Sequence, residues 1–355
     1  MPGKLRLGFV GAGYMAQTTH IPNFLAVPEV EPVALAEARP KLARRAAEYF
    51  HIPRAVSSHK DIAAMDDVDA VVAIMGEAFH PKVAIDLLSA GKHVFIEKPL
   101  ATSAAVGQEM VQAAEKAGKL LMVGYMKRYD EGVMRARELL GNLLADKELG
   151  EPTLVRIHCF GGGWNCDLRA PLATDEPPAP LEATPDPDWL PEAWRGPWNP
   201  FHIFRNVYCH NLNLLRFLFN CHESDLGVHC CLYRPPTFAV TLALGDLPIS
   251  MDFGQLSAHS WDEYLSVYFR DGRLDVLTPP PLLRNVSARV VVYRAGARQE
   301  THELLGPWSW GFYREAEAFV RCCLGEEQCL ADGRDALEDM LLIERILQRA
   351  IEDSA

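Results

Sequence analysis

The sequence of 355 residues has no run of about 18 or more apolar residues, the length that a membrane-spanning helix needs. It has no internal repeat. An apolar run already begins at Leu5, which leaves no room for a signal peptide before it. We therefore expect a cytoplasmic protein without a membrane anchor.

An excess of positive charge is also missing. Lys and Arg number 35 and Asp and Glu number 47, so the formal net charge is 35 − 47 = −12. This balance disfavours nucleic acid or an anionic membrane as the main partner. A hydrophobic content of 49% with 23% charged residues is ordinary for a globular protein, and the length predicts two domains.

The nine cysteines all lie at or after position 159, and their spacing fits no zinc-binding pattern. The adjacent pairs Cys230–Cys231 and Cys322–Cys323 suit a regular disulfide framework poorly. We expect most of the thiols to be reduced, buried small hydrophobes. No metal is predicted; the alternative would be a site formed by Cys209, His210 and His202.

A glycine-rich turn follows the first apolar run. Leu5–Val10 reads as a buried strand, and Gly11-x-Gly13-x-x-Ala16 follows it directly. Gly11 permits a tight turn, Gly13 lets backbone amides approach a pyrophosphate, and Ala16 lets the next helix pack closely. The alternative is an ordinary strand-to-helix turn. The residues of the turn that we expect to contact the cofactor are Gly11, Gly13, Tyr14 and Met15.

An acidic residue ends the second apolar strand. Val33–Ala36 is followed by Glu37, whose carboxylate would bond the adenine ribose hydroxyls of NAD. Arg39 could hold a 2′-phosphate instead, but Glu37 would repel that group. The sequence therefore predicts NAD as cofactor, with NADP as the less favoured alternative.

Strands and helices alternate through the first third of the chain, which predicts a parallel sheet with right-handed crossovers. Ligands bind beyond the carboxyl ends of such strands. Glu97, Lys98 and Tyr125 lie at such ends, as do Gly11 and Glu37. The further strands that we expect here are 69–74, 93–96 and 120–124, and the helices are 41–50, 80–90 and 103–117.

A family resemblance enters with residues 90–101, Ala-Gly-Lys-His-Val-Phe-Ile-Glu-Lys-Pro-Leu-Ala. Together with the glycine-rich turn, they closely resemble the glucose–fructose oxidoreductase, inositol dehydrogenase and rhizopine-catabolism family of nicotinamide-dependent dehydrogenases. Residues 313–320 and 335–340 resemble the family's closing helices. The resemblance covers nearly the whole chain, with a gap around residues 162–204.

The resemblance implies an α/β subunit of two domains. Residues 1–125 would form an NAD(P)-binding Rossmann domain. Residues 126–355 would form a substrate-binding α/β domain with a large open, mostly antiparallel sheet that joins a homodimer or homotetramer. The C-terminal helices would pack back on the Rossmann domain, and a cis peptide would precede Pro99.

The resemblance also places Lys98 beside the nicotinamide. Hydride transfer from a secondary alcohol requires loss of the hydroxyl proton, and a positioned ammonium stabilises the alkoxide or relays its proton. Without the resemblance, a structural pair between Lys98 and Glu97 is equally plausible.

Residues 204–216 resemble the family's Asp-x-Gly-x-His-x-x-Asp helix. His210 falls on the catalytic histidine, whereas Asn206 and Asn213 stand where the family has aspartates. An asparagine orients without charge, so His210 would be less basic and Lys98 would take more of the proton transfer, with Asn206 bonding substrate hydroxyls. Arg128, in a similar Gly-x-x-x-Arg-Tyr segment, would contact substrate or cofactor; the alternative is a solvated arginine.

The second half of the chain reads mainly as strands. Consecutive apolar or alternating runs from Leu226 onward, with turns at 245–246 and 271–272, predict an antiparallel sheet. Residues 152–160 are expected to form the first strand of this sheet. Two closing helices are expected at 313–324 and 333–353. An inserted loop at 161–204 is rich in proline and holds four tryptophans. We interpret it as an ordered loop over the cleft or across a subunit contact.

These patterns predict an NAD(P)-dependent oxidoreductase acting on a secondary hydroxyl or ketone of a sugar, polyol or cyclitol. Two alternatives stay open: a lyase, hydrolase or epimerase that uses tightly bound NAD in a transient oxidation, and a non-catalytic ligand sensor with the same fold.

Overall fold

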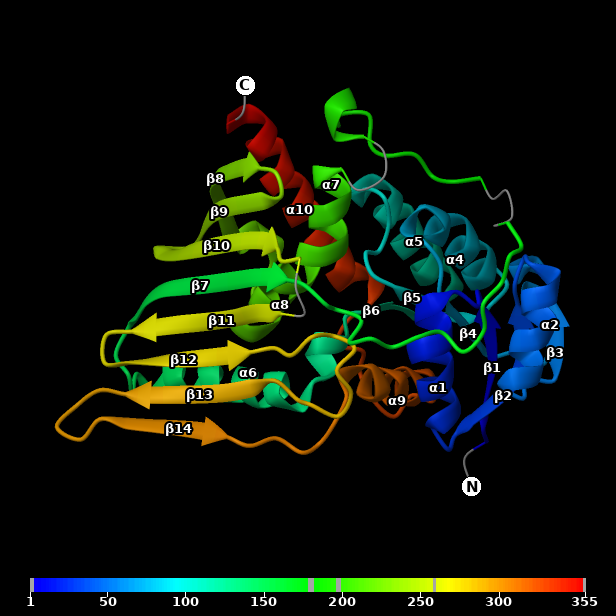
Figure 1. Cartoon of the computed structure of the whole chain (residues 1–355), viewed down its shortest axis with the longest axis horizontal. Coiled ribbons are helices and arrows are strands. Elements are labelled where there is room, and N and C mark those ends of the chain that lie inside the picture. The colour runs from blue at the N-terminus through cyan, green and yellow to red at the C-terminus, as the bar shows by residue number, and fades with distance from the viewer. Residues whose placement is uncertain (1–2, 178–181, 196–198, 258–259, 354–355) are drawn as a thin grey trace. The chain divides into compact units, whose positions relative to one another are not determined.

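The computed structural model describes residues 3–177, 182–195, 199–257 and 260–353. Two compact units divide the chain (Figure 1). The N-terminal unit comprises Met1–Tyr125, Leu168–Leu190 and Phe312–Met340. The second unit comprises Met126–Asp167, Pro191–Gly311 and Leu341–Ala355.

The N-terminal unit is built on a sheet of parallel strands in the order β3-β2-β1-β4-β5-β6. It confirms the predicted Rossmann sheet. β4 and β6 are buried along their whole length, as expected for strands covered on both faces. The strands are β1 (Leu5–Val10), β2 (Val30–Ala36), β3 (Arg54–Val56), β4 (Ala70–Ala73), β5 (His93–Glu97) and β6 (Leu121–Gly124).

The strand order reverses between β1 and β4, and ligands of such sheets bind at this switch point. A π-helical turn, η1, follows β1 and runs into α1, and helices connect the later strands. The helices of the unit are η1 (Ala16–His20), α1 (Ile21–Ala26), α2 (Pro40–Tyr49), α3 (His59–Ala63), η2 (Glu77–Phe79), α4 (His80–Ser89), α5 (Ala104–Ala117), nearly all of α9 (Gly311–Cys323) and the first part of α10 (Gly333–Asp353).

The second unit is built on a larger sheet in the order β14-β13-β12-β11-β7-β10-β9-β8. Only β7 and β10 pair in parallel, so the sheet is mostly antiparallel, as predicted. Its strands are β7 (Pro152–Gly161), β8 (Leu226–Arg234), β9 (Thr237–Leu244), β10 (Leu247–Gln255), β11 (Trp261–Phe269), β12 (Gly272–Leu277), β13 (Arg289–Arg294) and β14 (Glu300–Leu304).

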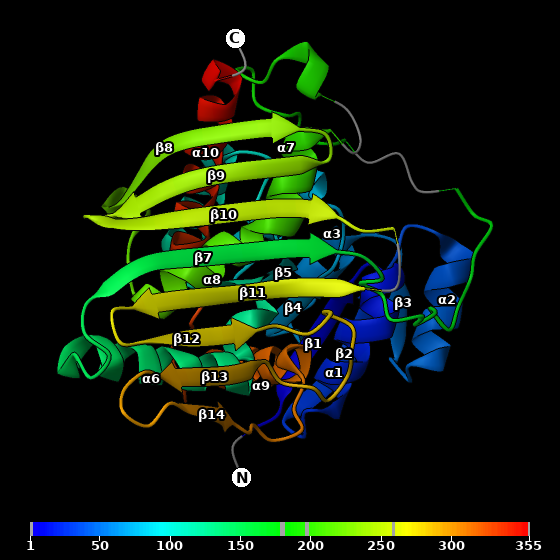
Figure 2. The same cartoon turned by 60° about the vertical axis from the view of Figure 1, so that its left-hand side comes forward.

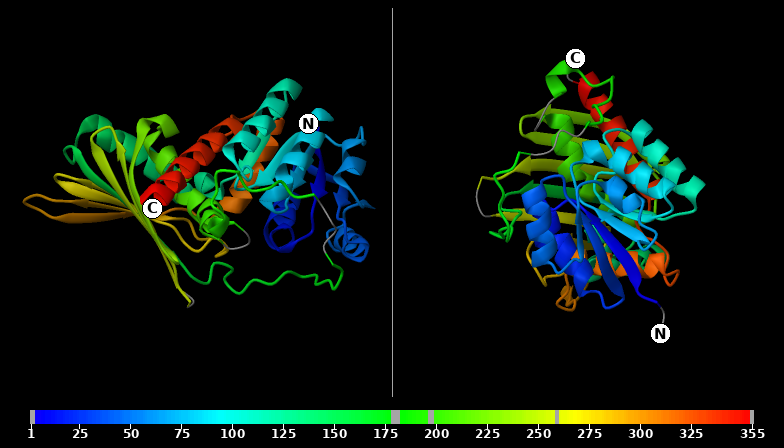
Figure 3. Two further views of the ribbon diagram at one scale, coloured as in Figure 1. Left: turned by 90° about the horizontal axis from the view of Figure 1, so that it is seen from above. Right: turned by 90° about the vertical axis from the view of Figure 1, so that its right-hand side faces the viewer.

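Helices α6 and α8 lie against one face of this sheet (Figures 2 and 3). Alternation along β7 turns Val155, Ile157 and Cys159 toward this covered face, where they are buried. The helical segments of the unit are η3 (Met126–Tyr129), α6 (Glu131–Asp146), η4 (Glu192–Trp194), α7 (Pro200–Ile203), η5 (Phe204–Tyr208), α8 (Cys209–Phe219), η6 (Glu223–Asp225) and the end of α10.

The proline-rich segment, for which the sequence predicted no regular structure, contains two short helical elements, η4 and α7. Its part Leu168–Leu190 belongs to the N-terminal unit. One of its tryptophans, Trp198, lies outside the described residues. Elsewhere, the cis peptide expected before Pro99 is confirmed. In the described part of the chain, no helix is long and apolar enough to cross a membrane.

Candidate functional site: a dinucleotide turn and a histidine helix

The glycine-rich turn lies at the switch point of the parallel sheet. Gly11 has φ +90°, and a Cβ at this position would lie 2.2 Å from the carbonyl oxygen of Ile74, which follows β4. Any side chain there would force the two strand ends apart. Gly13 differs, because a Cβ on it would meet nothing within 4 Å, so the backbone faces open space there. The turn therefore offers close backbone approach beside the N-terminal end of the helix that starts at Ala16.

Glu37 joins the end of β2 to this turn. Its Oε2 accepts a hydrogen bond from the Ala12 backbone N–H at 2.9 Å, and Arg39 donates to both carboxylate oxygens at 2.8 and 3.0 Å. Burial raises the pKa of Glu37, but the hydrogen bonds from Arg39 and Ala12 outweigh it, so the pKa lies below its ordinary value. Glu37 is thus an ionised, buried acceptor, and Arg39 is bound to it.

Glu97 and Lys98 follow β5 at the same edge of the sheet. Glu97 Oε1 accepts a hydrogen bond from His20 Nε2 at 2.5 Å, and its Oε2 accepts one from the backbone N–H of Lys98 at 3.0 Å. Burial raises the pKa of Glu97, yet His20 and the charge of Lys98 bring it below its ordinary value. His80 donates from Nδ1 to the Pro99 carbonyl at 3.0 Å. These bonds fix the backbone on both sides of Lys98.

Glu315, on α9, is a second carboxyl group in this region that the sequence did not single out. Its side chain is fully buried, and neither carboxyl oxygen has a hydrogen-bond partner among the described residues. Burial, with the nearby charge of Glu97, raises the pKa of Glu315 well above its ordinary value. A group in this environment holds its proton in the native state.

The Glu315→Gln variant is expected to gain thermal stability over the original protein as the pH rises. The native state keeps a proton that the unfolded chain releases above about pH 4.3, so this carboxyl lowers stability as the pH increases. Glutamine cannot ionise, so the variant lacks this loss of stability at higher pH. Melting temperatures measured from pH 5 to pH 8 check this; a difference between the two proteins that stays constant with pH would show that Glu315 does not titrate in this way.

The second unit carries His210 and Asn206 on one continuous helical segment. Asn206 lies in the π-helical turn η5, His210 lies in the first turn of α8, and both are half-buried. Such π-helical turns are frequent at functional sites because they re-aim side chains out of the regular helix. The sequence predicted a helix here but not this irregularity.

Arg128 is buried rather than solvated, so the alternative of a solvated arginine is wrong. It is 3% exposed, its Nε donates to Asn213 Oδ1 at 2.8 Å, and its guanidinium lies over the Phe217 ring. Asn213 therefore orients this arginine.

A buried network lies next to His210 in the chain. The Lys127 ammonium pairs with Glu263, which also accepts from Asn211 Nδ2 at 2.7 Å and from Trp261 Nε1 at 3.0 Å. Glu263 comes from β11, so the network ties α8 to the sheet. Sequence reasoning missed it because its members come from three distant segments.

The candidate residues thus form two groups. Gly11, Gly13, Tyr14, Met15, Glu37, Arg39, Glu97 and Lys98 belong to the N-terminal unit, and Arg128, Asn206 and His210 to the second unit. Within the first group, Glu37 binds the turn through Ala12. The open backbone at Gly13, the adjacent helix terminus and the ionised acid at the end of β2 fit a nicotinamide dinucleotide.

The fold and this turn define a dinucleotide-binding Rossmann protein. Residues 5–125 match the model of a family described as "Oxidoreductase family, NAD-binding Rossmann fold". Over these residues the match supports the resemblance read from the sequence, to the family of glucose–fructose oxidoreductase, inositol dehydrogenase and rhizopine-catabolism proteins.

Curated relatives match part of the chain. An "Inositol 2-dehydrogenase" of Salmonella paratyphi B is 31% identical over 175 residues, 48% of this chain and 51% of that protein. An "Inositol 2-dehydrogenase/D-chiro-inositol 3-dehydrogenase" of Shouchella clausii is 34% identical over 158 residues, 43% of this chain and 44% of that protein. The chain spans about half the length of the curated relatives it matches.

Solved structures share the fold over almost the whole chain. The 3-ketoreductase KijD10 from Actinomadura kijaniata, in complex with NADP and TDP-benzene, has a TM-score of 0.74 at 19% identity and 98% coverage of both chains. An aldose-aldose oxidoreductase from Caulobacter crescentus has a TM-score of 0.73 at 22% identity and 98% coverage of both chains. At these identities the likeness concerns the fold.

Proposed function

We propose that this protein is an NAD-dependent oxidoreductase. It would transfer a hydride between the nicotinamide and a secondary hydroxyl or ketone of a sugar, polyol or cyclitol. The observation that carries the proposal is the turn at Gly11, at the switch point of the sheet, which is linked through the Ala12 N–H to the ionised Glu37. In the same unit, β5 ends at Glu97 and is followed by Lys98 and Pro99. The inositol dehydrogenases among the relatives favour a polyhydroxylated substrate.

In this proposal the bound nicotinamide accepts or supplies the hydride, and the chain handles the proton. Lys98 is placed at the carboxyl end of β5 with its backbone fixed by Glu97 and His80. An ammonium held there stabilises the negative charge that develops on the substrate oxygen, or takes part in moving its proton. The neighbouring Glu97 carboxylate accepts a hydrogen bond from His20.

His210 would be the second proton-handling group, and Asn206 would hold substrate hydroxyls through its amide. Asn206 lies in the π-helical turn η5, and His210 lies in the first turn of α8, which follows it directly. Arg128, which Asn213 orients, would add a positive group to the substrate site. The proposal requires Lys98 and His210 to reach one nicotinamide together.

The cofactor is proposed to be NAD rather than NADP. A carboxylate at the end of β2 bonds ribose hydroxyls and repels a 2′-phosphate, and Arg39 is already bound by that carboxylate. The KijD10 structure holds NADP, so this assignment depends on the residues of this chain.

A cytoplasmic homodimer or homotetramer joined through the larger sheet is also proposed. Opposite α6 and α8, that sheet carries His158 stacked between the rings of Phe160 and Tyr264 and paired with Asp252 and Asp262. Aromatic rings packed together with acidic side chains on one sheet face suit contact with a second copy. Sedimentation of the purified protein tests the assembly.

The activity is tested by following reduced nicotinamide and product together over a panel of cyclitols, sugars and sugar acids. A dehydrogenase forms the two in equal amounts. Product without accumulated reduced nicotinamide would instead indicate the transient oxidation of a lyase, hydrolase or epimerase. Binding of NAD and a panel compound without turnover would indicate a ligand sensor.

A further inference from the structure

A segment from the proline-rich insertion lies across the cofactor turn of the N-terminal unit. We call Leu168–Glu176 the strap. The Tyr14 hydroxyl donates to the Leu168 carbonyl at 2.9 Å. Gln17, the second residue of η1, binds the backbone of Leu172 through both atoms of its amide, donating from Nε2 at 3.2 Å and accepting at Oε1 at 2.9 Å. The strap is thus docked beside the turn that would bind pyrophosphate.

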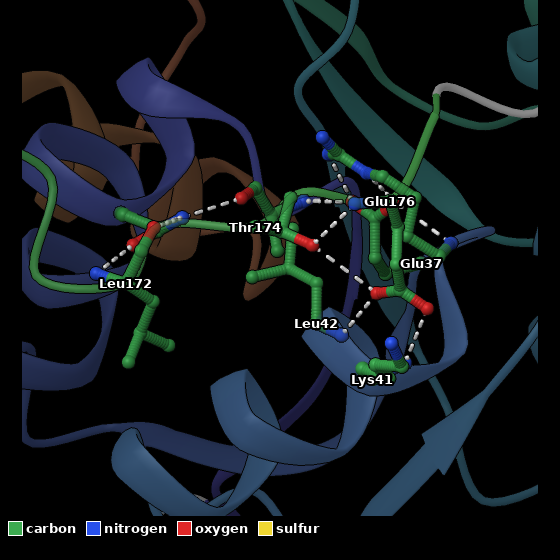
Figure 4. Close-up of polar contacts among 9 residues, drawn as sticks. Glu37, Lys41, Leu42, Leu172, Thr174 and Glu176 are labelled. Carbon is green, nitrogen blue, oxygen red and sulfur yellow. Dashed lines mark hydrogen bonds and ion pairs between the residues drawn. The ribbon is translucent and has the colours of Figure 1, made fainter.

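The strap then reaches the start of α2 (Figure 4). Glu176 accepts hydrogen bonds from the backbone N–H groups of Lys41 at 3.0 Å and Leu42 at 2.9 Å, and from the Thr174 hydroxyl at 3.2 Å. Arg45, further along α2, donates to the Ala173 carbonyl at 2.7 Å. The first N–H groups of a helix lack partners within the helix, and here a side chain 134 or more residues away satisfies two of them.

Glu176 brings a second carboxylate to this point, beside Glu37 and Arg39. Desolvation raises the pKa of Glu176, but the hydrogen bonds from the N–H groups of Lys41 and Leu42 outweigh this effect. The pKa therefore lies below its ordinary value, and the carboxyl is ionised at neutral pH. Both acids act on Arg39: the hydrogen bonds that it donates to Glu37 and the negative charge of Glu176 each raise the pKa of its guanidinium. The charge of Arg39 is therefore influenced by two carboxylates, of which Glu37 binds it directly.

In Rossmann units the adenine ribose lies beside the end of β2, where a nearby arginine accommodates a 2′-phosphate. Helix N-termini add backbone N–H donors for such an anion. In this chain Glu37 binds Arg39, and Glu176 binds the donors of α2. A phosphate would have to displace Glu176 and remain beside Glu37, whereas an unphosphorylated ribose would not.

We propose that Glu176 is a specificity-determining residue of the dinucleotide site, which discriminates against NADP by occupying the α2 donors with its own carboxylate. The inference rests on the proposed function, because it requires that a dinucleotide binds at this turn. Glu176, which comes from a distant insertion, would thus act together with Glu37 in selecting NAD over NADP.

The test is calorimetric titration of NAD and NADP into the original protein and the variants Glu176→Ala and Glu176→Gln. Glu182→Gln is the matched control, since it removes the same charge from the same insertion at a well-exposed side chain that pairs with Lys82 on α4. We expect both Glu176 variants to bind NADP at least about tenfold more tightly, with NAD affinity changed far less. The control should keep the original ratio of affinities.

An unchanged ratio of NAD to NADP affinity in Glu176→Ala would overturn the inference and leave the proposed function standing. An equal loss of both affinities would overturn it too, because the strap would then hold either cofactor without selecting between them. If the original protein binds neither dinucleotide, the proposed function fails and the inference falls with it. Melting temperatures of all variants separate these outcomes from loss of fold.

Discussion

Replacing Lys98 by alanine is expected to lower kcat by about 10²–10⁴-fold while NAD still binds. The methyl group of alanine can neither stabilise an alkoxide nor move a proton. The backbone around it stays fixed, because Glu97 binds the N–H of residue 98 and His80 binds the carbonyl of Pro99. Steady-state rates with an identified substrate, together with calorimetric titration of NAD, give both quantities.

Two further lysine variants sharpen this result. Lys116→Ala removes an exposed lysine on α5 and should leave kcat unchanged. Lys98→Arg keeps the charge but cannot lose a proton, so partial rescue would assign electrostatic stabilisation, and no rescue would assign proton transfer or the shape of the ammonium. Normal turnover in Lys98→Ala would remove this lysine from the proposed mechanism.

The Gly11→Ala variant is expected to lose dinucleotide binding and much of its stability. The added Cβ would lie 2.2 Å from the Ile74 carbonyl oxygen, and the φ of +90° disfavours any residue with a side chain. The turn must shift, which also moves the Ala12 N–H that binds Glu37. Titration of NAD and the free energy of unfolding from urea denaturation measure the two effects.

Gly91→Ala provides the matched control for this glycine. Gly91 has φ +78°, but a Cβ there would meet nothing within 4 Å. It shares the backbone strain, about 1–2 kcal/mol, without the clash, and should therefore bind NAD normally. If Gly11→Ala costs no more stability than Gly91→Ala and binds NAD equally well, the close approach of the two strand ends is not what the site requires.

Most strands of both sheets were predictable from the order of apolar and polar residues, because the burial of one or both faces of a strand determines that order. β4 and β5 are buried apolar runs, and β9 alternates between covered and open faces. The short strand β3 and the polar edge strand β14 carry little such signal and were not predicted. Helix α6 was not predicted either, although Asp130 caps its first turn through the N–H groups of Gly132 and Val133.

The candidate site was predictable to the extent that its chemistry is local in sequence. The turn at Gly11, the acid at Glu37 and the Glu97-Lys98 end of β5 each follow a recognisable strand. Arg39 was weighed as a phosphate ligand, whereas the structure binds it to Glu37.

The contributions of Glu176 and Glu315 could not be read from sequence. Glu176 caps a helix that begins 136 positions earlier in the numbering, at Pro40, and a chain pattern carries no sign of this long-range contact. Glu315 looks like any polar position of an amphipathic helix, and only packing shows that it is fully buried.

The most direct measurement for the account as a whole is the fate of a hydrogen isotope. The protein is given NAD and an inositol or sugar with deuterium on the carbon of the reacting hydroxyl, and the cofactor and product are analysed by mass spectrometry. The account predicts that deuterium appears on the nicotinamide ring in equal amount to the ketone formed. Product that keeps its deuterium while the nicotinamide gains none would contradict it.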